Sequence, residues 1–101
     1  MSRAKIKIPK EQIAGFCRRH QIRNLSLFGS VLRDDFNPES DVDILVEFKP
    51  GTRIGLIGLT ALEFELSEIV GHKVDLNTPG FISKYFRDKI FVEREVQYAE
   101  A

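Results

Sequence analysis

Two short motifs in the first half of the chain carry residue types that could do chemistry together. A Gly29-Ser30 pair is followed by ten residues and then by Asp41-Val42-Asp43. In a β-strand, side chains two positions apart point to the same face and lie about 6–7 Å apart, at roughly 3.3 Å per residue. Both aspartates would therefore face one side of a strand and could share a divalent metal ion.

The Gly29-Ser30 pair predicts a sharp turn that can bind an anion. Glycine lets the backbone leave a preceding strand and lets a ligand approach the main chain closely. Ser30 would then begin a helical turn whose free N–H groups, together with the serine hydroxyl, suit the phosphates of a nucleotide. Magnesium accepts few carboxylates when substrate phosphates complete its shell, so the aspartates would supply its protein ligands. The combination indicates phosphoryl or nucleotidyl transfer.

Two strands are expected to position these motifs. The first covers residues 24–28, directly before the turn, and a brief helix follows over residues 30–33. The second covers residues 41–48, in which the even-numbered side chains are apolar and predict a core face. The aspartates occupy the opposite face and are expected to line a cleft. The polar segment 34–39 between the two strands predicts a loop.

Periodicity in the rest of the chain predicts three helices and a third strand. Helices are expected over residues 9–20, 56–70 and 81–91, because apolar side chains recur there at helical spacing. A strand is expected over residues 73–77, with Asp75 on its non-core face and therefore available to the cleft.

The apolar stripes of these helices predict their buried sides. In the last helix the stripe is Ile82, Phe86 and Ile90. In helix 56–70 the acids lie off the stripe and are expected to face solvent; they are Glu63, Glu65 and Glu68. The tail, residues 92–101, alternates charged and apolar residues and predicts no definite element.

Several other reactive side chains have simpler structural interpretations. Cys17 is the single cysteine, so it cannot form an internal disulfide and is expected to be buried as a small apolar side chain. His20 and His72 lie at predicted helix ends, and we expect them to cap these ends and not to take part in catalysis. Asp34 and Asp35 have no strand to orient them and are expected to be solvated loop acids. A secondary influence on metal or substrate is the alternative for these two.

The pattern Gly29-Ser30, ten residues, Asp41-x-Asp43, with apolar residues on both sides, resembles the signature of the nucleotidyltransferase superfamily that includes polymerase β. Within it, the chain is similar to the minimal nucleotidyltransferases, small prokaryotic proteins often paired as antitoxins with HEPN-domain toxins. The resemblance covers residues 8–98 and includes Pro50-Gly51, the following Leu-rich helix and the segment 71–76.

The resemblance implies a fold and a set of site residues. The fold is α/β, with a polymerase β-like core in which a short mixed sheet has helices packed on one side. In this family a later strand supplies a third carboxylate, a role that falls to Asp75. The implied catalytic residues and ligands of two magnesium ions are Asp41, Asp43 and Asp75. The implied nucleotide-binding residues are Gly29, Ser30 and Arg33.

The resemblance also implies a reaction and a partner. AMP would pass from ATP to a protein hydroxyl, and the implied acceptor is a tyrosine of a HEPN ribonuclease toxin that the modification would silence. A binding antitoxin that masks the toxin without turnover is one alternative, and transfer to a small molecule is another. One position departs from the pattern, because Asp34 follows Arg33 where many relatives have glycine. That departure affects the loop rather than the metal ligands.

Composition is typical of a globular protein. The 101 residues are 43% apolar and 30% charged, which predicts a single domain over residues 1–101. No apolar run approaches the roughly 20 residues that span a bilayer, and the N-terminus lacks the apolar core of a signal peptide. We therefore expect a cytoplasmic protein without a membrane partner.

The net charge is zero, but the charges are unevenly distributed along the chain. Residues 1–23 hold seven basic side chains against one acid, and residues 34–68 hold nine acids against two bases. Two interpretations are open: two solvated faces, or a basic rim that receives triphosphate or an acidic partner. Phe16 is the one aromatic among the bases, so the sequence does not favour direct binding of nucleic acid.

Overall fold

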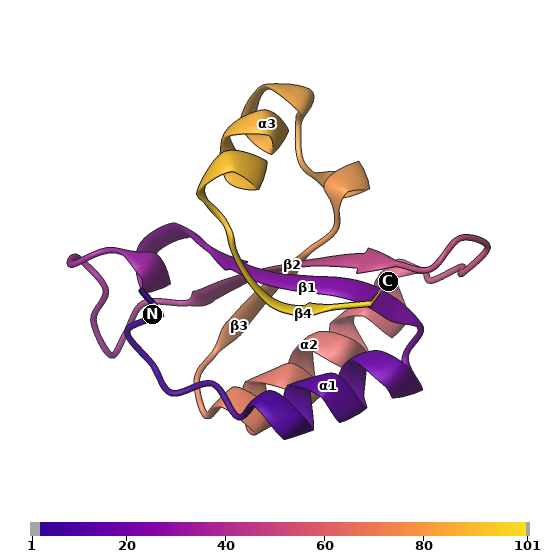
Figure 1. The fold of residues 1–101 in the computed structure, drawn as a ribbon, viewed down its shortest axis with the longest axis horizontal. Helices are drawn as coiled ribbons and strands as arrows, with labels where there is room; N and C mark the ends of the chain where they lie inside the picture. Colours follow the sequence, from indigo (N-terminus) through magenta and orange to yellow (C-terminus); the bar gives the residue numbers. More distant parts are fainter. Residues whose placement is uncertain (1–2, 101) are drawn as a thin grey trace.

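A computed structural model describes residues 3–100, which form a four-stranded mixed sheet and three α-helices (Figure 1). The strand order is β3-β2-β1-β4. The strands are β1 (Ile22–Phe28), β2 (Val42–Phe48), β3 (Val74–Asn77) and β4 (Glu95–Ala99). β1 pairs antiparallel with both β2 and β4, whereas β2 pairs parallel with β3. The predicted α/β class is confirmed.

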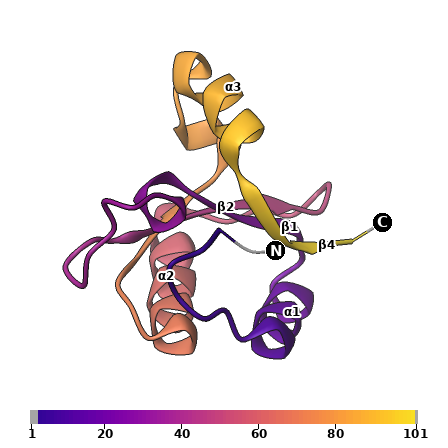
Figure 2. The same cartoon turned by 60° about the vertical axis from the view of Figure 1, so that its left-hand side comes forward.

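Two of the helices cover one face of the sheet. These are α1 (Lys10–Arg19) and α2 (Leu56–Val70), which lie side by side beneath the strands in both views (Figures 1 and 2). The third, α3 (Lys84–Glu93), stands on the opposite side of the sheet. Short 3₁₀ turns at Gly29–Leu32 and Pro79–Phe81 follow β1 and β3. Among the described helices, none is long and apolar enough to cross a membrane.

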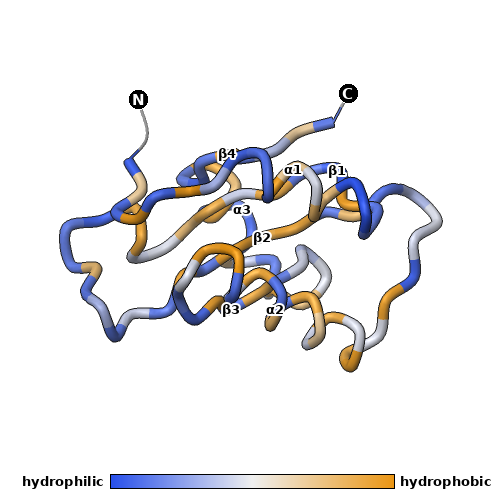
Figure 3. Tube along the Cα trace, turned by 90° about the horizontal axis from the view of Figure 1, so that it is seen from below, coloured by the Kyte–Doolittle hydropathy of each residue, from blue (hydrophilic) through white to orange (hydrophobic). Residues whose placement is uncertain are grey.

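The hydrophobic core lies between the sheet and the pair α1 and α2. Phe16 of α1 and Leu66 of α2 are fully buried there against Leu25 and Ile44 of the central strands. The hydrophobic segments of β1 and β2 run through the middle of the trace (Figure 3). Cys17 belongs to this core, as expected, and burial raises the pKa of its thiol to about 12. The thiol is therefore inert at neutral pH.

The predictions for the C-terminal third need correction. The last helix begins at Lys84 rather than at residue 81, because a 3₁₀ turn from Pro79 comes first. Its expected stripe is not a buried one: Phe86 remains 57% exposed, and no side chain of α3 is fully buried. The tail, for which no element was predicted, forms edge strand β4 along β1.

Two acids of α2 do not face solvent freely. The Glu63 carboxylate accepts a hydrogen bond of 2.8 Å from the backbone N–H of Leu76 in β3. Glu65 lies 2.7 Å from an Arg19 guanidinium nitrogen and 3.0 Å from Nε2 of His20. Both acids are off the apolar stripe of α2, but they sit where a neighbouring element approaches the helix. The solvent-facing prediction was therefore wrong for these two and right for Glu68, which is exposed.

The Glu65 ion pairs predict a modest pH-dependent contribution to stability. Burial raises the pKa of Glu65, but the hydrogen bonds from Arg19 and His20 outweigh it, so the net pKa lies below the ordinary value. The contribution is therefore present at neutral pH and is lost as pH falls through that lowered pKa. We expect Glu65→Gln to lower the free energy of unfolding by about 0.5–1 kcal/mol at pH 7.

Urea unfolding at pH 7 and pH 3 measures this effect. The matched control is Glu68→Gln, because Glu68 lies one turn away on an exposed face of α2. The deficit of Glu65→Gln relative to this control should shrink as pH falls from 7 to 3. Equal stability of the two variants at pH 7 would show that the ion pairs contribute nothing.

Candidate active site

The Gly29 turn and the Asp43 carboxylate lie in contact. β1 ends at Phe28, whose Cα partner in β2 is Asp43. Gly29 follows with φ +77°, in the left-handed region that favours glycine. A Cβ built on Gly29 would lie 2.2 Å from Oδ2 of Asp43, far inside any normal contact. Glycine is thus required here for its backbone conformation and for the close approach of the carboxylate.

The structure brings the three predicted acids to one part of the sheet. Asp43 in β2 and Asp75 in β3 are register partners across the parallel pair, and Asp41 lies just before β2. Val42 and Ile44 point into the core, so Asp43 points to the opposite face, where α3 stands. The cavity next to Gly29 is lined by none of these three acids, so the expected cleft around them stays a prediction.

Electrostatics couple these acids. Burial raises the pKa of Asp43 to about 6, aided by the negative charges of Asp75 and Asp41 and by a side-chain hydrogen bond with Asp75. The positive charge of Arg33 acts in the opposite direction. The site therefore concentrates more negative charge than its own cation compensates, a condition that a bound divalent ion would relieve.

The donor set suits magnesium. Aspartate oxygens are hard ligands, and Mg²⁺ commonly takes only one or two carboxylates while water and substrate phosphates complete its octahedron. Asp43 and Asp75, which are register partners in β2 and β3, could provide such a pair. Within residues 3–100, no group of three or more His, Cys, Asp or Glu side chains lies close enough to hold a metal ion, so Asp41, Asp43 and Asp75 are not gathered into a three-ligand site.

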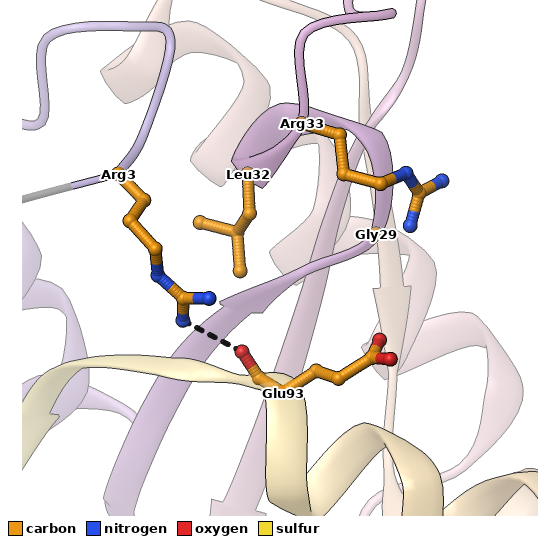
Figure 4. Close-up of a pocket in the computed structure, with 5 residues that line it drawn as sticks. All are labelled: Arg3, Gly29, Leu32, Arg33 and Glu93. Carbon is orange, nitrogen blue, oxygen red and sulfur yellow. Dashed lines mark hydrogen bonds between the residues drawn. The ribbon is translucent and has the colours of Figure 1, made fainter.

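A cavity of about 250 Å³ opens beside the turn. It is lined by Arg3, Gly29, Leu32, Arg33 and Glu93 (Figure 4). Nη2 of Arg3 donates a hydrogen bond of 2.7 Å to the backbone oxygen of Glu93 at the end of α3. The Arg33 side chain is 57% exposed, and its Nε lies 3.3 Å from Oδ1 of Asp35. Arg33 is thus within reach of a ligand in the cavity.

Arg3 and Glu93 were not predicted from the sequence as residues of this region. They are 90 positions apart, and neither belongs to a motif. The N-terminal segment reaches the site because the backbone N–H of Lys5 donates to the Val31 oxygen at 2.9 Å. Only the excess of bases in residues 1–23 hinted at a cationic rim there.

The two loop acids are exposed, as expected. Asp34 accepts a hydrogen bond of 2.9 Å from Nζ of Lys5, which lowers the pKa of its carboxyl group. Asp35 pairs with Arg33. The departure from the family pattern at Asp34 thus places an exposed carboxylate against Lys5 of the N-terminal segment.

Ser30 offers a test of the anion-binding turn. Its backbone oxygen accepts a hydrogen bond of 2.9 Å from the N–H of Arg33, a contact that alanine would keep. We expect Ser30→Ala to unfold like the wild type but to raise the Kd for Mg-ATP by about threefold to tenfold, the equivalent of one lost hydrogen bond. Isothermal titration calorimetry measures this, with the exposed Ser83→Ala as control. Unchanged affinity would exclude the hydroxyl as a ligand.

Comparison with known proteins agrees with this geometry. A family model described as a nucleotidyltransferase domain matches residues 9–98, and the chain belongs to this family. A protein of Methanocaldococcus jannaschii is 37% identical over 84 residues, which are 83% of this chain and 88% of the relative. A second protein from that organism is 33% identical over 75 residues, 74% of each chain. Both are named as candidate protein adenylyltransferases.

Solved structures share the fold. A candidate minimal nucleotidyltransferase is 28% identical, with a TM-score of 0.70 over 85% of this chain and 86% of that one. A toxin–antitoxin structure with AMP-PNP has a TM-score of 0.75 at 19% identity, covering 92% of this chain and 75% of that one. A complex of a tri-AMPylated Shewanella oneidensis HEPN toxin with its MNT antitoxin has a TM-score of 0.66 at 19% identity, over 90% and 70%. The resemblance to minimal nucleotidyltransferases is thus confirmed, and nucleotidyl transfer is the supported activity.

Proposed function

We propose that this chain is a magnesium-dependent adenylyltransferase that transfers AMP from ATP to a protein hydroxyl. The observation that carries the proposal is the contact between the Gly29 turn and the Asp43 carboxylate. It sets an anion-binding turn directly against carboxylates that suit Mg²⁺. Nucleotidyl transfer requires this juxtaposition, because the phosphates and the cation that neutralises them must be held together.

Each proposed site residue has a distinct task. Gly29 and Ser30 bind the terminal phosphates of ATP through main-chain N–H groups and the hydroxyl, and Arg33 neutralises part of their charge. Asp41 and Asp43 orient the nucleotide through the cation. Asp75 receives the proton of the incoming hydroxyl; its exposure, the greatest of the three acids, supports this role.

The proposed reaction is a displacement at the α-phosphorus of ATP. The acceptor oxygen forms a bond to that phosphorus, the bond to the β-phosphate bridging oxygen breaks, and pyrophosphate leaves. Two bound magnesium ions would supply charge stabilisation for the attacking and leaving oxygens. Most of the rate gain would then come from positioning and electrostatics.

The proposed acceptor is a tyrosine of a HEPN-domain toxin, which AMP modification would silence. Support comes from the relatives named as candidate protein adenylyltransferases and from the AMPylated toxin complex among the structural neighbours. The rival is a binding antitoxin that masks a toxin without turnover. Both require a protein partner, but only the first requires ATP and the aspartates.

The dependence of ATP binding on magnesium tests the site. We expect Mg²⁺ to increase the affinity of the wild type for ATP at least tenfold, and to change the affinity of Asp41→Asn/Asp43→Asn by less than twofold. Calorimetric titration of ATP with and without Mg²⁺ gives, for each protein, the ratio of the two affinities. The control is Asp34→Asn/Asp35→Asn, which makes the same charge change in the exposed loop and should keep the wild-type ratio. The same ratio in all three proteins would contradict the metal assignment.

A further inference from the structure

Helix α3 is an element without a packing partner in the described chain. It projects from the sheet on the face opposite α1 and α2 (Figures 1 and 2). None of its side chains is fully buried, and no other described element makes an extended contact with it. A helix of 10 residues is marginal by itself in water, since most helical stability in proteins comes from packing of an amphipathic face. We therefore expect α3 to pack against a surface outside the described chain.

Several apolar side chains are exposed on α3 and just before it. Tyr85 and Val92 are each 86% exposed and lie seven positions apart on one side of the helix, with the charged Asp88 and Lys89 between them. Phe86 is 57% exposed, and Phe81, in the 3₁₀ turn before α3, is 61% exposed. Such a cluster of exposed aromatic and aliphatic side chains is typical of a protein interface rather than of a free surface.

The C-terminal end of α3 is fixed beside the candidate active site. Glu93, its last residue, lines the same cavity as Gly29, and its backbone oxygen is held by Arg3 (Figure 4). The next residue, Arg94, lies 3.2 Å from a Glu47 carboxylate oxygen in β2. A protein that covers α3 would therefore come to lie against the turn that is proposed to bind the phosphates.

We propose that the α3 face, defined as Phe81, Tyr85, Phe86 and Val92, is the docking surface for the protein that accepts AMP. This inference rests on the proposed function, since transfer to a protein hydroxyl requires the acceptor to be held over an open site and to exclude water from it. The α3 face is positioned for this because Val92 directly precedes Glu93, which lines the cavity.

Position favours this occupant over others, because Val92 directly precedes Glu93, which lines the cavity. The exposed charges of α3 are balanced, with Lys84 and Lys89 against Asp88 and Glu93. The acceptor is therefore expected to offer an apolar patch bordered by both acidic and basic residues, close to the reacting hydroxyl. A second exposed apolar set on α2, Ile57 and Phe64, lies on the other face of the sheet and could not bring an acceptor to the aspartates.

That second set supplies a matched control. The test compares Tyr85→Ser/Val92→Ser on α3 with Ile57→Ser/Phe64→Ser on α2. The probe is the purified protein encoded beside this chain in its genome. Calorimetry without nucleotide measures its binding, a separate titration measures Mg-ATP affinity, and light scattering measures the oligomeric state of the chain.

We expect the α3 variant to weaken binding of the probe at least tenfold, to raise the KM for the probe by a similar factor and to leave Mg-ATP affinity unchanged. The α2 variant should change each value by less than twofold. Equal weakening by both variants, a wild type that does not bind the probe, or an α3-dependent dimer of this chain would overturn the inference. If α3-dependent binding occurs but the probe gains no AMP, the docking surface stands and the proposed transfer fails.

Discussion

Replacing Gly29 by alanine is expected to abolish AMP transfer and to lower the free energy of unfolding by about 2–4 kcal/mol. The new Cβ would lie 2.2 Å from Oδ2 of Asp43, and alanine would also resist the backbone φ of +77°. Either the turn must move or the Asp43 side chain must rotate away. In both cases the anion-binding turn and the metal-binding carboxylate lose their relative position, so the folded fraction of the variant should also be inactive.

Gly51→Ala separates the effect of backbone strain from the effect of the contact with Asp43. Gly51 has a similar φ of +85°, but a Cβ there would meet nothing within 4 Å. It should cost about 1–2 kcal/mol from backbone strain and leave transfer intact. Urea unfolding gives the stabilities, and release of pyrophosphate gives the activity. If Gly29→Ala were as active and as stable as Gly51→Ala, the contact with Asp43 would have no functional meaning.

Asp43→Asn is expected to stabilise the metal-free protein while it removes transfer activity. The pKa of Asp43 in the folded chain is about 6, against an ordinary value of 3.8. A raised pKa means that the folded state loses stability as pH rises between these two values, after which the penalty stays constant. Two pKa units correspond to roughly 3 kcal/mol, which solvent screening of this half-buried group reduces to about 1–2 kcal/mol.

Thermal unfolding in EDTA between pH 4 and pH 8 measures this effect. Asp43→Asn should melt about 4–12 °C above the wild type at pH 7, and the difference should shrink toward zero at pH 4. Asp35→Asn, in the exposed loop, should show no comparable gain. Saturating Mg²⁺ should then raise the melting temperature of the wild type and not that of Asp43→Asn. A variant that is less stable than the wild type at pH 7 would contradict the excess of negative charge at this site.

The sequence predicted those elements whose pattern is strong and local. Helix 56–70 matches α2 at both ends, because an apolar stripe is followed by Gly71, which takes the left-handed conformation at the helix end. Strands β2 and β3 were found from their alternation, and the alternation alone put Asp43 and Asp75 on the non-core face. These features are set by residues close together in the sequence, so the observed elements agree closely with the predicted ones.

Features set by distant partners were not predictable in this way. β4 has a weak pattern of its own and becomes a strand because it pairs with β1, about 70 residues earlier. The stripe of Ile82, Phe86 and Ile90 correctly indicated a helix, but it could not reveal whether the chain itself covers that stripe. In the same way, the spacing in the sequence predicted that Gly29 and Asp43 lie near each other. Only the structure shows that they lie too close for residue 29 to carry a Cβ.

The most direct test of adenylyl transfer to a protein is the intact mass of the neighbouring gene's product after incubation with this chain, ATP and Mg²⁺. We predict that its mass increases by one or more AMP units, that Asp41→Asn/Asp43→Asn abolishes the increase, and that any ribonuclease activity of that product falls only when it is modified. An unmodified product that the double variant still inhibits would contradict the account and favour a binding antitoxin.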